Sequence, residues 1–218
     1  MDRSRGKAAI ERAGILPDYQ GTVVHDRFVS YFGYACDHRL CNAHILRELI
    51  DSKEKDQVSW AQPMIDLLLS AKYKVDQGQP IAKSYLTRTQ NRFKQIIRQE
   101  LAGLKEEAKG KKPIRGKPKR SEADNLLLAL NNYHREVLAF LTNPTVPYDS
   151  NQAERDLRMI KTRQKISGCF RSTQAGEAFA TIRGFVSTLK KQRTHLFDGF
   201  KVLFQSPEYL LEQLNMTE

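Results

Sequence analysis

The chain has 218 residues, of which 36 are Lys or Arg and 25 are Asp or Glu, so its formal net charge is +11. Its 40% hydrophobic and 28% charged content is typical of a globular protein, and it has neither a bilayer-length apolar run nor a secretory signal, so a membrane partner is not expected. Three cysteines are too few for a disulfide framework, which favours a cytoplasmic location.

The N-terminal part holds the segments that favour β-structure. Residues 8–13 suit a short helix that ends at Gly14. Residues 21–25 predict a strand, and residues 32–38 predict a second extended segment. Because so few strands cannot satisfy their backbone hydrogen bonds alone, we expect them to belong to a sheet whose other strands are not encoded here.

From Asn42 onward, apolar residues recur at helical spacing. Three stripes predict three helices. They are Leu46, Leu49 and Ile50; Met64, Leu67, Leu68, Ala71 and Val75; and Phe93, Ile97, Leu101 and Leu104. A fourth stripe, from Leu127 to Leu141, predicts one further amphipathic helix.

Positive charge is concentrated in two segments. Residues 109–120 hold seven basic residues and no acidic one, and their Pro and Gly residues predict a mobile connection. Residues 151–193 hold ten basic and three acidic residues and predict helices near 151–164 and 174–192, followed by an apolar tail at 195–214. Such clusters are typical of nucleic-acid phosphate contacts, although a solvated lysine-rich loop and an ordinary basic helix would give the same pattern.

Asp26 directly follows the first predicted strand. In open α/β sheets, ligands and metals bind at the carboxyl ends of strands. An aspartate in this position also commonly caps a turn. Both interpretations of Asp26 stay open at this point.

Cysteine and histidine alternate shortly after Asp26. Cys36, His38, Cys41 and His44 could in principle surround zinc, but their spacing matches no common zinc module. Zinc is therefore not favoured. We expect Cys41 and His44 to be structural residues that fix the first turn of a helix against the strand before Asp26.

Glu154 also allows two interpretations. With Asn151 it forms the pattern of a capping box, in which the glutamate bonds back to the backbone N–H of the cap residue. It also shares a helix face with Arg158 and Lys161. A carboxylate among cations near a helix N-terminus suits a metal ion and phosphates together.

Four stretches of this sequence together resemble the bacterial insertion-sequence transposases of group sixty-six. They are residues 21–26 with Tyr31, residues 40–49, residues 151–158, and residues 167–172 with Gly176 and Glu177. Such transposases have a ribonuclease-H-like core, in which an Asp-Asp-Glu triad holds two divalent ions that activate water or a 3′-hydroxyl for attack on DNA. The resemblance implies that Asp26 is the second acid and Glu154 the third.

The resemblance implies a fold that is mainly α with a small β remnant, a partial ribonuclease-H-like α/β core interrupted by a large helical insertion. Residues 1–45 would be the remnant of the catalytic core, and residues 46–146 a helical insertion that carries the basic loop 109–120. Residues 147–193 would be returning core helices, and residues 194–218 a C-terminal tail.

The implied partners are double-stranded DNA, both element ends and target, with further copies of the chain or other element-encoded proteins, in the nucleoid. Mg²⁺ or Mn²⁺ would be bound by Asp26 and Glu154. The residues expected at the DNA backbone are Arg155, Arg158, Lys161, Arg163, Lys111, Lys112, Arg115, Lys117, Lys119 and Arg120.

The first acid of the triad has no match in this chain. Asp2 is at the terminus, and Asp18 is too close to Asp26 to lie on a separate neighbouring strand. We therefore expect an N-terminally truncated copy of a transposase that cleaves and joins DNA. The alternative is a non-catalytic basic helical protein that binds DNA or the transposase itself.

Overall fold

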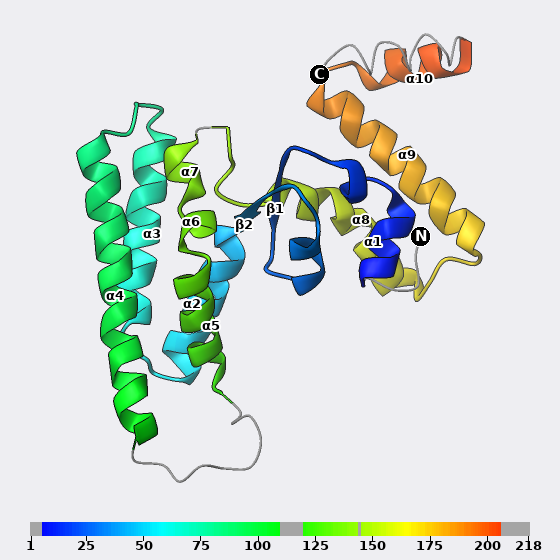
Figure 1. Ribbon diagram of the computed structural model, residues 1–218. Coiled ribbons are helices and arrows are strands. Elements are labelled where there is room, and N and C mark those ends of the chain that lie inside the picture. Colours follow the sequence, from blue (N-terminus) through cyan, green and yellow to red (C-terminus); the bar gives the residue numbers. More distant parts are fainter. Residues whose placement is uncertain (1–5, 110–119, 144, 206–218) are drawn as a thin grey trace. The chain divides into compact units, whose positions relative to one another are not determined.

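The computed structural model describes most of the chain. The described residues are 6–109, 120–143 and 145–205, of which 105–109 are described by their backbone alone. The chain divides into two compact units, Ser4–Ser150 and Asn151–Glu218, the second together with Met1–Arg3 (Figure 1). Within the described part, no helix is both long and apolar enough to cross a membrane.

The Ser4–Ser150 unit begins with short helices and two short strands. They are α1 (Lys7–Ala13), η1 (Leu16–Asp18), β1 (Thr22–His25), η2 (Val29–Gly33) and β2 (Asp37–Leu40). The helix predicted to end at Gly14 and the first predicted strand are confirmed. The second strand begins later than predicted, because Phe32 lies in η2, where its ring stacks on Tyr133 with centroids 4.7 Å apart.

β1 and β2 form a two-stranded parallel sheet. Its register pairs His25 with Leu40, the last residues of the two strands, and the N–H of Cys41 donates to the C=O of His25 at 2.9 Å. Because parallel strands run in the same direction, their carboxyl ends meet at one edge of the sheet. Asp26 and Cys41 therefore both follow that edge.

Four longer helices build the core of this unit. They are α2 (Asn42–Lys55), α3 (Ala61–Asp76), α4 (Lys83–Lys109) and α5 (Glu122–Asn132) (Figure 1). Ile50, predicted in the first apolar stripe, is 43% exposed, whereas the other stripe residues of these helices lie in the core or pack against it. Leu49, Leu68 and Phe93 have no exposed area, and Trp60, just before α3, is also buried. Burying a side chain of this kind stabilises the fold by about 1.5–3 kcal/mol. The prediction of a mainly helical fold is confirmed, and the ribonuclease-H-like core stays a prediction.

The single helix predicted from Leu127 to Leu141 is wrong. The structure has three helices there, α5, α6 (His134–Val137) and α7 (Ala139–Thr142). The N–H of Leu141 donates to the C=O of Leu138 rather than to that of Val137. The freed Val137 carbonyl accepts the side-chain N–H of buried Asn42 at 3.0 Å. A buried carbonyl must find a donor, so this distant contact compensates for the break.

The described part of the second unit consists of α8 (Asn151–Ser167), α9 (Thr173–Lys191) and α10 (Leu196–Gln205). The two helices predicted near 151–164 and 174–192 are thereby confirmed. Ser172 caps α9, because its Oγ accepts the N–H of Ala175 at 3.1 Å. The turn between α8 and α9 contains exposed Cys169. α9 and α10 approach closely where Gly199 packs against Leu189, a spot with no room for a larger residue.

The predicted basic loop 109–120 is described only at its ends. Lys109 is the last residue of α4, and exposed Arg120 precedes Ser121, the N-cap of α5. Residues 110–119 lie outside the described part, so the mobility of the loop stays a prediction.

Candidate functional site

Asp26 opens the connection between the two strands. Its side chain is exposed, and its Oδ1 accepts the N–H of Phe28 at 3.2 Å, which closes a turn around Arg27. Arg27 has a φ of 65°, a left-handed conformation that costs a non-glycine residue about 1–2 kcal/mol. A carboxylate has further lone pairs, so closing the turn and binding a ligand are compatible roles for Asp26.

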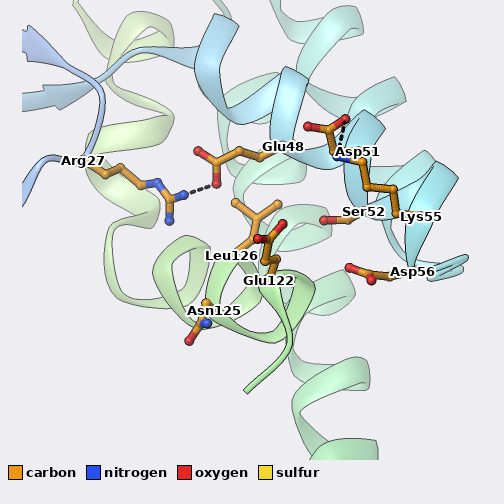
Figure 2. Close-up of a pocket in the computed structure, with 9 residues that line it drawn as sticks. All are labelled: Arg27, Glu48, Asp51, Ser52, Lys55, Asp56, Glu122, Asn125 and Leu126. Carbon is orange, nitrogen blue, oxygen red and sulfur yellow. Dashed lines mark hydrogen bonds and ion pairs between the residues drawn. The ribbon is translucent and has the colours of Figure 1, made fainter. Parts of the chain in front are cut away.

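An ion pair holds this turn against α2. Nη2 of Arg27 contacts Oε2 of Glu48, and both residues line a hollow of about 400 Å³ together with residues of α2 and α5 (Figure 2). Acidic residues outnumber basic ones in the lining, which disfavours this hollow for DNA phosphates. The pairing of Arg27 with Glu48 was not predicted, because residues 21 positions apart carry no local signal of pairing.

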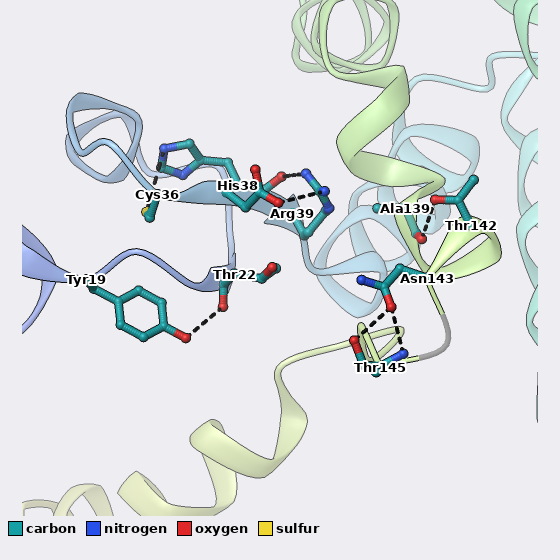
Figure 3. A network of polar contacts seen from close by, with 10 residues as sticks. Tyr19, Thr22, Cys36, His38, Arg39, Ala139, Thr142, Asn143 and Thr145 are labelled. Carbon is teal, nitrogen blue, oxygen red and sulfur yellow. Dashed lines mark hydrogen bonds and ion pairs between the residues drawn. The ribbon is translucent and has the colours of Figure 1, made fainter. Parts of the chain in front are cut away.

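His25, the residue before Asp26, is buried and neutral. Burial, and to a lesser extent the nearby His38, lower the pKa of His25 to about 4, against the opposing effect of Asp26. Nε2 of His38 lies 3.9 Å from Sγ of Cys36, as Figure 3 shows. The same nitrogen lies 3.0 Å from the C=O of Tyr34. A carbonyl only accepts, so this nitrogen carries the proton, and Nδ1 of His38 accepts from Nε2 of His25 at 3.2 Å. His25 thus serves to fix the end of β1.

A buried thiol joins the segment before α8 to the start of α2. Sγ of Cys41 accepts the N–H of Ser150 at 3.2 Å, and the N–H of Asn42 donates to the C=O of Tyr148 at 3.1 Å. Since Cys41 also bonds to the C=O of His25, three hydrogen bonds tie this segment and α2 to the carboxyl edge of the sheet. These contacts support the structural role predicted for Cys41.

The four residues considered for zinc make different contacts. Cys36 lies beside His38, whereas Cys41 accepts from Ser150. The N–H of His44 donates to the C=O of Cys41 at 3.1 Å in the first turn of α2. Within the described ranges, no three His, Cys, Asp or Glu side chains are grouped so that they could hold a metal ion.

α8 presents Glu154 and basic side chains to solvent. The exposed basic residues predicted to contact DNA on this helix are Arg155, Arg158, Lys161 and Arg163. At about 100° per residue, Glu154 shares one face with Arg158 and Lys161. The capping role predicted for Glu154 with Asn151 stays a prediction.

Asp156 connects α8 to α9. Its carboxylate accepts Ser187 Oγ at 2.8 Å, Lys191 Nζ at 2.6 Å and Gln152 Nε2 at 3.1 Å. The hydrogen bonds from Lys191 and Ser187 hold the pKa of Asp156 below its usual value. Although Asp156 belongs to the stretch that carries the resemblance, its contacts give it a structural task.

The two predicted catalytic acids lie in different units, Asp26 in Ser4–Ser150 and Glu154 in Asn151–Glu218. Their approach within metal-binding reach stays a prediction. The loop residues predicted to contact DNA at Lys111, Lys112, Arg115, Lys117 and Lys119 lie outside the described residues.

The sequence of the chain matches the family described as Transposase IS66 family over residues 1–178. The chain belongs to the IS66 transposase family. Over 70 residues it is 37% identical to the uncharacterized protein y4jO of Sinorhizobium fredii (strain NBRC 101917 / NGR234). This stretch covers 32% of the chain but only 22% of y4jO, and no solved structure matches the chain.

Membership of the IS66 family implies DNA binding in general. It agrees with the exposed basic face of α8, which is not needed to build a core because α8 has no buried residue.

Proposed function

We propose that this chain supplies two acids of an Asp-Asp-Glu site that cleaves and joins DNA during transposition of an insertion sequence. Asp26 is the second acid, Glu154 is the third, and the first lies outside these 218 residues. The position of Asp18 supports the last point, because it lies in the 3-10 helix leading into β1 and not on a neighbouring strand.

The observation that carries the proposal is the anchor around Cys41. It bonds to His25, the residue before Asp26, and to Ser150, the residue before α8. Glu154 follows Ser150 by four residues, a length of chain that spans at most about 14 Å. Both acids, 128 positions apart in the sequence, thus lie within a few residues of the segments that this anchor ties together.

The two side chains fit a hard divalent cation. Both are exposed carboxylates, and carboxylate oxygens are the ligands that Mg²⁺ and Mn²⁺ prefer. When bound, such an ion polarises the phosphate and lowers the pKa of an attacking water. Arg158 and Lys161, on the same face of α8 as Glu154, would hold the DNA backbone beside the two acids.

The deciding experiment compares this chain with the same chain joined in frame to an upstream segment that supplies the first acid. The 218-residue chain should bind DNA without cleaving it, because two carboxylates do not hold a metal pair at the spacing that in-line attack needs. The joined protein should cleave element ends with Mg²⁺ or Mn²⁺, and Glu154→Gln should abolish cleavage. Glu54→Gln, which alters an exposed glutamate on α2, is the matched control and should leave cleavage intact.

Two results would contradict the proposal. Cleavage by the 218-residue chain itself, abolished by Asp26→Asn, would mean that another acid such as Asp18 or Asp149 completes the site. Equal cleavage by the joined protein and its Glu154→Gln variant would remove Glu154 from the site.

The second candidate is a non-catalytic protein that binds DNA or the transposase itself. The exposed basic residues of α8 favour it equally, since they require no metal chemistry. DNA binding by the joined protein without cleavage under any divalent metal would support this function over the first.

A further inference from the structure

A second basic site lies between α8 and α9. A hollow of about 320 Å³ there is lined by Arg155, Arg183, Lys190 and Lys191, with Asp156 as the single acidic residue. All of these residues belong to the Asn151–Glu218 unit. The lining thus carries three positive charges in excess.

The charges in this hollow are not all committed to contacts within the protein. Lys191 balances Asp156 through a 2.6 Å hydrogen bond, and Nη2 of Arg155 donates to Oε1 of Gln152 at 2.8 Å. Nε of Arg183 is shielded from solvent and has no hydrogen-bond partner among the described residues. Although Nε itself is closed to a ligand, the Arg183 guanidinium is a positive charge at the lining of the hollow for which the described contacts supply no carboxylate.

A purely structural explanation covers only part of the cluster. Lys190 and Lys191 lie in the last turn of α9, where cations stabilise the negative end of a helix. Arg183 lies two turns earlier in α9, too far from the helix C-terminus to stabilise its negative end. The hollow also includes the first turn of α8, whose positive end attracts anions.

We propose that this hollow binds a backbone phosphate of double-stranded DNA, with Arg183 as its main ligand. The inference rests on the DNA-binding part of the proposed function and adds a contact that the sequence did not single out. Gln152 and Asp156, which line the hollow, lie on the opposite side of α8 from Glu154, because residues follow one another at about 100° around a helix. The phosphate in the hollow is therefore distinct from the one that would be cleaved at Glu154.

The test is the salt dependence of binding to a short DNA duplex by the full 218-residue chain, titrated with KCl. Losing one phosphate contact lowers the slope of log K against log[KCl] by about 0.9. Arg183→Gln should show this change together with a roughly tenfold weaker affinity at low salt. Lys190→Gln, at an exposed position, should also lower this slope. It serves as a second variant if Arg183→Gln fails to fold.

The matched control is Lys201→Gln, which removes a charge from exposed α10 without touching the hollow. Its slope should stay within about 0.3 of the wild-type value. If Arg183→Gln and Lys190→Gln behave like Lys201→Gln, the phosphate site is overturned, while DNA binding by the wild type still upholds the proposed function. If the wild-type chain shows no salt-dependent DNA binding, the site and the DNA-binding role fall together.

Discussion

The two units differ in how they are held together. Ser4–Ser150 contains a continuous core of large buried side chains, whereas the buried residues described in α8, α9 and α10 are Gly176, Leu189 and Gly199. In the second unit, α8 and α9 are also joined by polar contacts, such as the hydrogen bonds that Asp156 accepts from Ser187 and Lys191. The comparison indicates a division between a packed scaffold that supports Asp26 and a basic, lightly packed surface that carries Glu154.

The largest expected effect is in the core of the first unit. Phe93→Ala should lower the free energy of unfolding by about 3–5 kcal/mol, because Phe93 is fully buried and its removal leaves a cavity. Leu157→Ala, at a 53% exposed position of α8, should change it by less than about 0.5 kcal/mol. Urea unfolding followed by Trp60 fluorescence and by circular dichroism measures both. Similar losses of unfolding free energy for the two variants would contradict the difference in packing between the two units.

Acid should weaken the first unit before the second. His25 has a folded pKa of about 4 against an ordinary value of 6.5, so the unfolded chain takes up this proton first. Stability is therefore lost as the pH falls from about 6.5 to about 4, by roughly 2–3 kcal/mol in total. Trp60 fluorescence in urea at several pH values tests this. His25→Gln should flatten that part of the curve, and an unchanged curve would exclude His25 as its cause.

A smaller loss is expected at the break between α6 and α7. Asn42→Ala removes the donor to the Val137 carbonyl and should cost about 1–2 kcal/mol of unfolding free energy, because a buried acceptor loses its partner. Asn132→Ala, at an exposed position, is the matched control and should be nearly neutral. Equal urea midpoints for both variants would show that the Asn42 contact adds nothing.

The smallest effect concerns the second unit. Asp156 has a lowered folded pKa, so its contribution is present above its ordinary pKa of 3.8 and is lost as the pH falls below that value. Its ion pair with Lys191 is partly exposed, so Asp156→Asn should cost less than about 1 kcal/mol at neutral pH. Helix content by circular dichroism, titrated below pH 4, distinguishes wild type from variant. A loss above pH 5 in that signal would point to another group.

Local sequence patterns predicted the helices and strands but not the hydrogen bonds between residues far apart in the sequence. The stripes containing Leu49, Leu68 and Phe93 identified helices correctly, because burial on one helix face repeats along the sequence. The break after Val137 could not be predicted, since its partner Asn42 is 95 residues away. Apolar periodicity alone continued through that position.

The candidate site also combines residues that have a local sequence signal with contacts that have none. Asp26 could be chosen because it ends a recognisable strand, and Glu154 because it lies in a distinctive stretch of sequence. The bond from Ser150 to Cys41 spans 109 residues, and the hollow containing Arg183 depends on how α8 and α9 pair. Such contacts arise from tertiary packing and leave no local pattern to read.

The three cysteines differ in exposure, so a thiol-reactive reagent can modify one of them selectively. Cys169 is exposed between α8 and α9, whereas Cys41 is buried and Cys36 is half-buried beside His38. A thiol-reactive fluorophore should therefore label the second unit preferentially, and Cys36→Ser would sharpen that selectivity. Trp60, the single tryptophan of the chain, is buried in the first unit and is a ready energy-transfer donor. Transfer between the two would follow the separation of the units as Mg²⁺ or DNA is added.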